Sequence, residues 1–100
     1  MIYFSIDIET DGPIIAKHSM ISFGVVKVEK GFKDTFYGEL KPIGDSYVPK
    51  ALSISGFSRE ETLKFRDAKE VMLEFAEWLK KVNPTNDRII FCADNNGFDF

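Results

Sequence analysis

The sequence has 100 residues and a mass of 11.4 kDa, enough for one small domain, and its 44% hydrophobic and 29% charged residues exclude a wholly disordered chain. Thirteen basic against sixteen acidic residues give a net charge of −3, which excludes a strongly basic surface over the whole chain. A single cysteine, Cys92, excludes an internal disulfide, and no apolar run is long enough to span a membrane. The N-terminus lacks a signal-peptide pattern, so we expect a cytoplasmic, reducing location, with Cys92 buried as a small apolar residue.

Three strands are predicted in the first forty residues. Apolar and polar residues alternate from Ile2 to Glu9, which predicts a strand with one buried face. A second strand is predicted over residues 19–28, where Gly24 indicates a bulge or a close backbone approach. A turn at residues 29–31 then leads into a third strand, from Phe32 to Leu40.

The remaining pattern predicts helices and one further strand. Residues 41–57 contain two prolines and two glycines and are predicted to form a long surface connection. Ser58 and Glu61 have the spacing of a capping box, which predicts a short helix ending near Phe65. Asp67 is the predicted cap of a long helix whose apolar residues recur at helical spacing up to residue 82. Residues 88–93 are apolar after Arg88 and predict a central strand.

The predicted order is therefore β-β-β-α-β, an α/β chain. One long helix covers only one face of a four-stranded sheet, so the other face is left open. We therefore expect a domain that is incomplete at its C-terminus: either a fragment of a longer domain or a chain completed by a partner or by self-association.

Two acidic side chains at the end of the first predicted strand indicate metal chemistry. Asp7 and Glu9 lie two residues apart, so their carboxylates project from the same face. Adjacent carboxylates repel each other and lose solvation, which a hard divalent cation such as Mg²⁺ or Mn²⁺ offsets. If the first and fourth strands pair in parallel, Asp99 comes close to Asp7 and supplies a third carboxylate. A solvated strand edge explains Asp7 and Glu9 equally well, and a helix N-terminal acid explains Asp99 alone.

Four segments resemble the DnaQ-like, or DEDD, family of 3′–5′ exonucleases. Residues 4–13 resemble its first motif, an apolar strand ending in Asp-x-Glu-Thr-x-Gly. Residues 20–26 resemble its second strand, residues 51–58 the segment before its long helix, and residues 95–99 its second motif, Asn-x-x-Phe-Asp. The resemblance implies an RNase H-like mixed sheet with helices on both faces. Residues 1–100 would then be the N-terminal part of a single exonuclease domain.

The same resemblance implies a metal-dependent 3′–5′ exonuclease that hydrolyses phosphodiester bonds at the 3′ ends of single-stranded DNA or RNA. It implies two Mg²⁺ or Mn²⁺ ions, with Asp7 bridging both, Glu9 binding one and Asp99 completing the cluster in part. Three positions are implied to lie at the substrate: the backbone near Thr10 and Asp11, and Asn95.

The chain lacks the third motif of the family, which supplies a fourth Asp and a preceding His or Tyr as general base. His18 is the only histidine, and no Asp follows it at the required distance, so it is interpreted as a solvated loop or strand-start residue. The 100 residues alone are therefore expected to be inactive. Two other functions stay open: a non-catalytic RNase H-like interaction domain, and an RNase H-like endonuclease that uses the same carboxylates.

Other residues are weaker candidates for nucleic-acid contacts. Phe36, Tyr37 and Phe57 are suited to base stacking, but they fit core or loop anchors better. A basic cluster near the start of the long helix suits a phosphate backbone, although interleaved acids favour a solvated face: Arg59, Lys64, Arg66 and Lys69.

Overall fold

The computed structural model describes residues 1–93, so the predicted site residues Asn95 and Asp99 lie outside it. Its four strands form one mixed sheet in the order β3-β2-β1-β4. β1 (Ile2–Thr10) pairs antiparallel with β2 (Met20–Lys27) and parallel with β4 (Ile89–Cys92), and β2 pairs antiparallel with β3 (Thr35–Glu39). The predicted α/β class and the parallel pairing of the first and fourth strands are confirmed.

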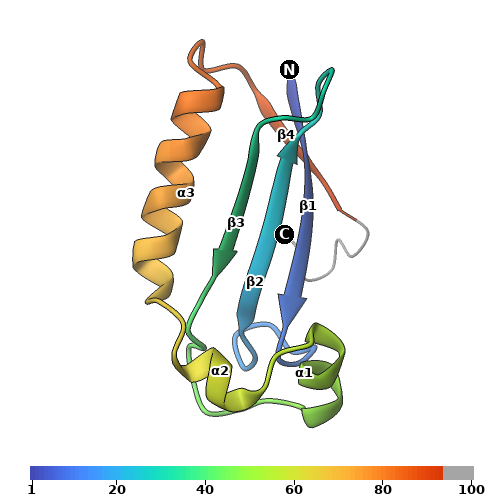
Figure 1. Cartoon of the computed structure of the whole chain (residues 1–100), viewed down its shortest axis with the longest axis vertical. Coiled ribbons are helices and arrows are strands. Elements are labelled where there is room, and N and C mark those ends of the chain that lie inside the picture. The colour runs from blue at the N-terminus through green and yellow to red at the C-terminus, as the bar shows by residue number, and fades with distance from the viewer. Residues whose placement is uncertain (94–100) are drawn as a thin grey trace.

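Helix α3 (Ala68–Val82) covers one face of the sheet (Figure 1). Alternation along β1 points Phe4 and Ile6 toward this helix, where Phe23 and Phe75 meet edge to face with ring centroids 5.1 Å apart. The C-terminal end of α3 is tied to the sheet because Lys27 Nζ donates a hydrogen bond to the carbonyl oxygen of Val82, at 2.8 Å. This aromatic core holds the four strands in register.

Two short helices lie beyond the carboxyl end of β1 (Figure 1). α1 (Pro49–Ser55) begins with a proline at its first turn and ends at Gly56, which adopts a left-handed φ of 83°. α2 (Arg59–Leu63) begins with the predicted capping box, in which Ser58 and Glu61 exchange side-chain to backbone hydrogen bonds. The prediction that residues 41–57 are a long surface connection is therefore wrong in its second half, which contains α1.

Two strand predictions are corrected in β2 and β3. Gly24 marks neither a bulge nor a close approach, because the only register shift of the β1–β2 pair lies between Glu9 and Thr10 and no atom lies within 4 Å of a Cβ added at Gly24. Phe32 does not belong to the third strand: it is exposed, has a positive φ of 45° and donates its N–H to the carbonyl of Glu29 within the turn.

The prediction of a central, buried fourth strand is also wrong for the described residues. Within residues 1–93, β4 pairs with β1 on one side only, and its apolar side chains are half-buried. Cys92, expected to be buried, is exposed on the face opposite α3. In the same range, no helix is long and apolar enough to cross a membrane.

Candidate active site

Asp7 and Glu9 lie side by side on the face of the sheet opposite α3. β1 alternates strictly up to this point, so the register that buries Ile6 and Ile8 beneath α3 projects both carboxylates the other way. Asp7 is exposed, whereas Glu9 is half-buried. Burial raises the pKa of Glu9 above its usual value, and the neighbouring charge of Asp7 raises it further. The negative charge of this pair is therefore unfavourable unless a cation compensates it.

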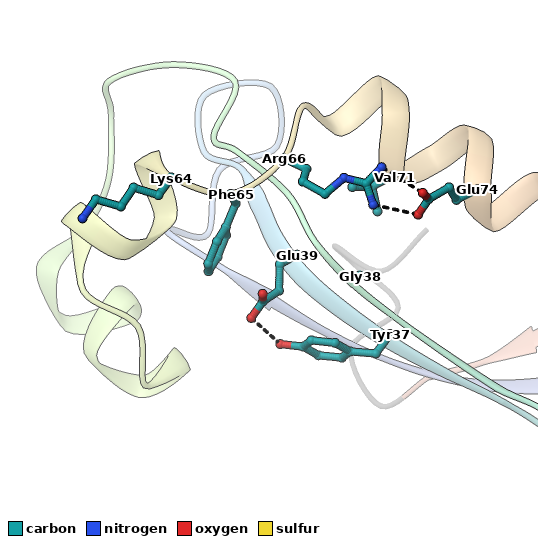
Figure 2. A pocket seen from close by; sticks show the side chains of 8 residues that line it. All are labelled: Tyr37, Gly38, Glu39, Lys64, Phe65, Arg66, Val71 and Glu74. Carbon is teal, nitrogen blue, oxygen red and sulfur yellow. Dashed lines mark hydrogen bonds and ion pairs between the residues drawn. The ribbon is translucent and has the colours of Figure 1, made fainter.

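Two further polar side chains share this face from β3. Glu39 is the cross-strand partner of Ser22, which is itself the partner of Glu9, while Tyr37 is reached from Asp7 through Gly24. The Tyr37 hydroxyl donates a hydrogen bond to Glu39 Oε2 at 3.1 Å (Figure 2). Burial, followed by this bond and the charge of Glu39, raises the pKa of Tyr37.

Sequence reasoning missed Glu39 and misjudged Tyr37. Tyr37 was predicted to be a core or loop anchor, but 60% of it is exposed, because its strand position points away from α3. The alternation over residues 35–39 contained the signal for both residues, since Phe36 faces the core and the odd-numbered positions 37 and 39 must therefore face the other way.

The surface is hollowed on both sides of Asp7. One groove of about 330 Å³ runs between β1 and β4, and Cys92 and Ala93 form its far wall. A second, of about 310 Å³, runs across β2 and β3 and reaches Tyr37. The described end of β4, at Cys92 and Ala93, therefore lies beside Asp7.

The carboxylate oxygens of Asp7 and Glu9 are suitable ligands for a hard divalent cation. Carboxylate oxygens are the ligands that Mg²⁺ and Mn²⁺ prefer. Among residues 1–93, no three His, Cys, Asp or Glu side chains come together closely enough to hold a metal ion. Asp7 and Glu9 thus account for two ligands, and the predicted third ligand, Asp99, lies outside the described residues.

The two residues after Glu9 have different surroundings: Thr10 lies at the end of the strand, and Asp11 is buried. Thr10 ends β1, just past the register shift. Asp11 is fully buried: its carboxylate accepts hydrogen bonds from the Ser19 N–H and from Arg59, and its own N–H and carbonyl are bonded to Ser19 and Val48. The polar groups of Asp11 are therefore all hydrogen-bonded within the protein. Of the two residues, only Thr10 is left for the expected backbone contact with a nucleotide.

His18 is not the solvated residue that the sequence suggested. It is buried, and its Nδ1 accepts a hydrogen bond from the Ile14 N–H at 3.0 Å. Its ring packs against Gly12, where an added Cβ would clash with the ring carbon Cγ. His18 and Gly12 therefore shape the loop that follows β1.

The predicted basic face is split in two. Arg66 pairs with Glu74 in two hydrogen bonds of 2.8 Å on the exposed surface, as a solvated face requires (Figure 2). Arg59 departs from the prediction, because it is largely buried against Asp11. Of the three aromatic candidates, Phe36 joins the core and Phe57 packs edge to face on Phe65, as expected.

A cavity of about 280 Å³ opens at the outer edge of β3, between this strand and the connection from α2 to α3 (Figure 2). Its polar groups are largely paired with one another, as Tyr37 is with Glu39 and Arg66 with Glu74. Neither Asp7 nor Glu9 lines it. The two carboxylates therefore lie outside this edge cavity, although Tyr37 lines both the cavity and the groove beside Asp7.

The mixed sheet and its helices match solved structures of 3′–5′ exonucleases in fold. Over 93% of its length the chain matches the nuclease domain of 3′hExo, described as a DEDDh family member, with a TM-score of 0.74, 22% identity and coverage of 51% of that chain. Over 98% of its length it matches Escherichia coli exonuclease I bound to a dT13 oligonucleotide, with a TM-score of 0.70, 21% identity and coverage of 21% of that chain.

In sequence, the chain is 34% identical over 100 residues to the 3′–5′ DNA exonuclease Cap18 of Escherichia coli. This match covers 99% of the chain and 53% of that protein, so the chain spans about half the length of this relative. No protein-family model matches the sequence. Together, these similarities confirm the RNase H-like fold and the resemblance to the DnaQ-like exonucleases.

Proposed function

We propose that this chain is the N-terminal part of a metal-dependent 3′–5′ exonuclease domain that removes nucleotides from the 3′ ends of single-stranded DNA or RNA. The observation that carries the proposal is the paired carboxylates of Asp7 and Glu9, of which Asp7 lines a groove that the end of β4 also lines. The 34% identity to a 3′–5′ DNA exonuclease supports the same reaction.

Asp7 and Glu9 would hold Mg²⁺ or Mn²⁺ together with Asp99. The unfavourable negative charge at Glu9 supports this assignment, because a bound cation offsets it. Such ions, when bound, activate water and stabilise the charge that develops on the phosphate and the leaving oxygen. The sheet contributes rigidity: β1 is paired with β2 at both Asp7 and Glu9, so the spacing of the two carboxylates is fixed before substrate binds.

Substrate would reach the carboxylate pair along the open face. The matched exonuclease I structure contains a dT13 oligonucleotide, and another matched structure is described as recognising the 3′ end of a histone mRNA stem-loop, with a TM-score of 0.73 and 20% identity. These support a nucleic-acid 3′ end as substrate here. Thr10 and Asn95 are the positions we assign to the terminal nucleotide.

Two narrower assignments are also proposed. The open face exposes Tyr3 and Tyr37, which supports self-association of the 100-residue chain; sedimentation velocity over a concentration series would measure it. The single, unpaired Cys92 supports a reducing, cytoplasmic location, which cell fractionation would test.

The activity test uses the full encoded protein, meaning this chain with whatever its reading frame encodes after Phe100. A 5′-labelled single-stranded oligonucleotide should shorten in steps from its 3′ end when Mg²⁺ or Mn²⁺ is added. Asp7→Asn and Glu9→Gln should each lower the rate roughly 100-fold or more, since each removes a proposed ligand. Glu77→Gln, on the exposed side of α3, is the matched control and should retain full activity.

Three other results would contradict the proposal. Cleavage of circular single-stranded DNA would indicate an endonuclease. Full activity in both site variants would remove the carboxylate pair from the reaction. A protein that folds and binds nucleic acid but cleaves nothing with either metal would favour the non-catalytic interaction domain.

A further inference from the structure

Asp11 is a buried carboxylate at the junction of three segments. None of its surface is exposed, and each of its oxygens is used: Oδ1 accepts from the Ser19 N–H at 2.6 Å and Oδ2 accepts from Arg59 Nη1 at 2.9 Å. A buried charge is tolerated only when it is paired and hydrogen-bonded, so Asp11 and Arg59 depend on each other.

The backbone of Asp11 adds two more connections. Its N–H donates to the carbonyl of Ser19 at 2.9 Å, and its carbonyl accepts from the N–H of Val48 at 2.7 Å. Ser19 immediately precedes β2, and Val48 is the residue that caps α1. Asp11 therefore fixes the chain that leaves β1 against both the start of β2 and the start of α1.

Arg59 extends the junction to a loop distant in sequence. Its second guanidinium nitrogen, Nη2, donates to the carbonyl of Gly44 at 2.9 Å, and its Cζ lies 4.5 Å from the centroid of the Tyr47 ring. Because Arg59 is the first residue of α2, it links that helix to the loop before α1 and to the end of β1.

The junction begins two residues after Glu9, at the point where the β1–β2 register shifts. The β1–β2 ladder is irregular between Glu9 and Thr10 and resumes with the Thr10–Met20 pair and the Asp11 N–H bond to Ser19, and the Asp11–Arg59 contacts lie directly beyond it. From this placement we infer that Asp11 and Arg59 form a positioning pair that holds the Glu9–Thr10 end of β1 for the proposed reaction, without touching metal or substrate themselves. This inference rests on the proposed exonuclease function.

Arg59→Lys is the decisive variant, because it keeps the charge but loses the forked contact to Asp11 and Gly44 and the stacking on Tyr47. In the full encoded protein, we expect kcat to fall about 10- to 100-fold with KM nearly unchanged, and the Mn²⁺ concentration for half-maximal activity to rise about 10-fold. Asp11→Asn, which keeps the volume and removes the charge, should behave alike. The matched control is Arg66→Lys, whose arginine makes a forked ion pair with Glu74 on the exposed surface, and it should change none of these values.

A readout independent of activity separates positioning from loss of folding. Arg59→Lys should speed hydrogen exchange at the amides of Asp11, Ser19 and Val48, while the amides in the middle of β1 and in α3 stay protected. Mn²⁺ binding measured by calorimetry should weaken by the same factor as the kinetic half-saturation.

The outcomes keep the two proposals apart. An active wild type together with an Arg59→Lys variant of unchanged kcat and Mn²⁺ affinity would overturn the positioning role and leave the exonuclease function standing. A wild type that folds but degrades no substrate would overturn both. Equal losses in Arg59→Lys and Arg66→Lys would also overturn the inference, because the remote pair would then matter as much as the junction.

Discussion

The two faces of the sheet are made by the same three strands but differ in what they contribute: one packs against α3, and the other carries the acidic side chains. Toward α3, aromatic side chains fill the space, with Phe4, Phe23 and Phe75 nearly or fully buried. On the other face, the same strands carry Asp7, Glu9 and the Tyr37–Glu39 pair, and Asp7 and Tyr37 line surface grooves there. One face carries stability and the other carries like charges that oppose it.

This contrast shows how a short chain accommodates an unfavourable site. Neighbouring carboxylates cost free energy when they are close and partly buried. The strand alternation lets the packed face offset that cost without moving either carboxylate, because each residue that packs fixes the orientation of its neighbours. Substitutions on the packed face should therefore lower the free energy of unfolding, whereas removing a carboxylate from the open face should raise it in the absence of metal.

The largest expected effect is on the packed face. Phe75→Ala removes a ring that contacts Phe23, Phe36 and Trp78, and should lower the free energy of unfolding by about 3–5 kcal/mol. Chemical denaturation of the full encoded protein would measure this. Met72→Ala, on the same helix but 40% exposed, is the control and should cost far less. Equal losses for the two variants would mean that α3 does not pack as described.

Metal binding should stabilise the open face. At a Mn²⁺ concentration about 100 times its Kd, the wild type should gain about 2.7 kcal/mol of unfolding free energy, because only the folded state brings the ligands together. Glu9→Gln should lose most of this gain, whereas Glu77→Gln on α3 should keep it. Denaturation with and without Mn²⁺ checks the prediction, and an equal gain in wild type and Glu9→Gln would contradict it.

A pair of glycines compares the faces with one substitution. Gly38 faces the core, where an added Cβ would lie 2.7 Å from Val71 Cγ1 and 2.9 Å from Phe23 Cε1. Gly38→Ala should therefore cost about 1–3 kcal/mol through overpacking. Gly24 faces the open side with no atom within 4 Å of an added Cβ, so Gly24→Ala should be neutral or stabilising by up to about 1 kcal/mol. Thermal unfolding of both variants would rank them, and the reverse order would refute the assignment of faces.

Regular periodicity made much of the fold predictable. The alternation in β1 and the helical spacing of α3 indicated both elements to within a residue or two, and the Ser58–Glu61 spacing indicated the start of α2. The Asp7–Glu9 pair followed from the same alternation. A local pattern is enough where one face of an element is buried, because burial enforces the period.

The errors have physical causes as well. Helix α1 was missed because Pro49 and Gly56 were interpreted as loop residues, although a proline at the first turn and a glycine in the left-handed C-cap are helix boundaries. Phe32 follows Gly31 into positive φ, which no strand pattern reveals. The Asp11–Arg59 pair joins residues 48 positions apart, so spacing along the chain contains no signal for it.

The smallest effect is electrostatic and tests the open face through pH. The folded state raises the pKa of Glu9 through burial and the charge of Asp7, so the folded protein holds this proton more tightly than the unfolded chain does. Stability should therefore fall as pH rises from the unfolded value, near 4.5, through the higher folded value, and the penalty is complete above it. Glu9→Gln removes the titrating group, so without metal at pH 7 it should be more stable than wild type by about 0.5 kcal/mol or less. The difference should shrink toward pH 4, and Asp7→Asn should shrink it as well by removing the neighbouring charge. Denaturation curves at several pH values would measure this, and a Glu9→Gln variant less stable than wild type at pH 7 would show that the carboxylate is favourably paired instead.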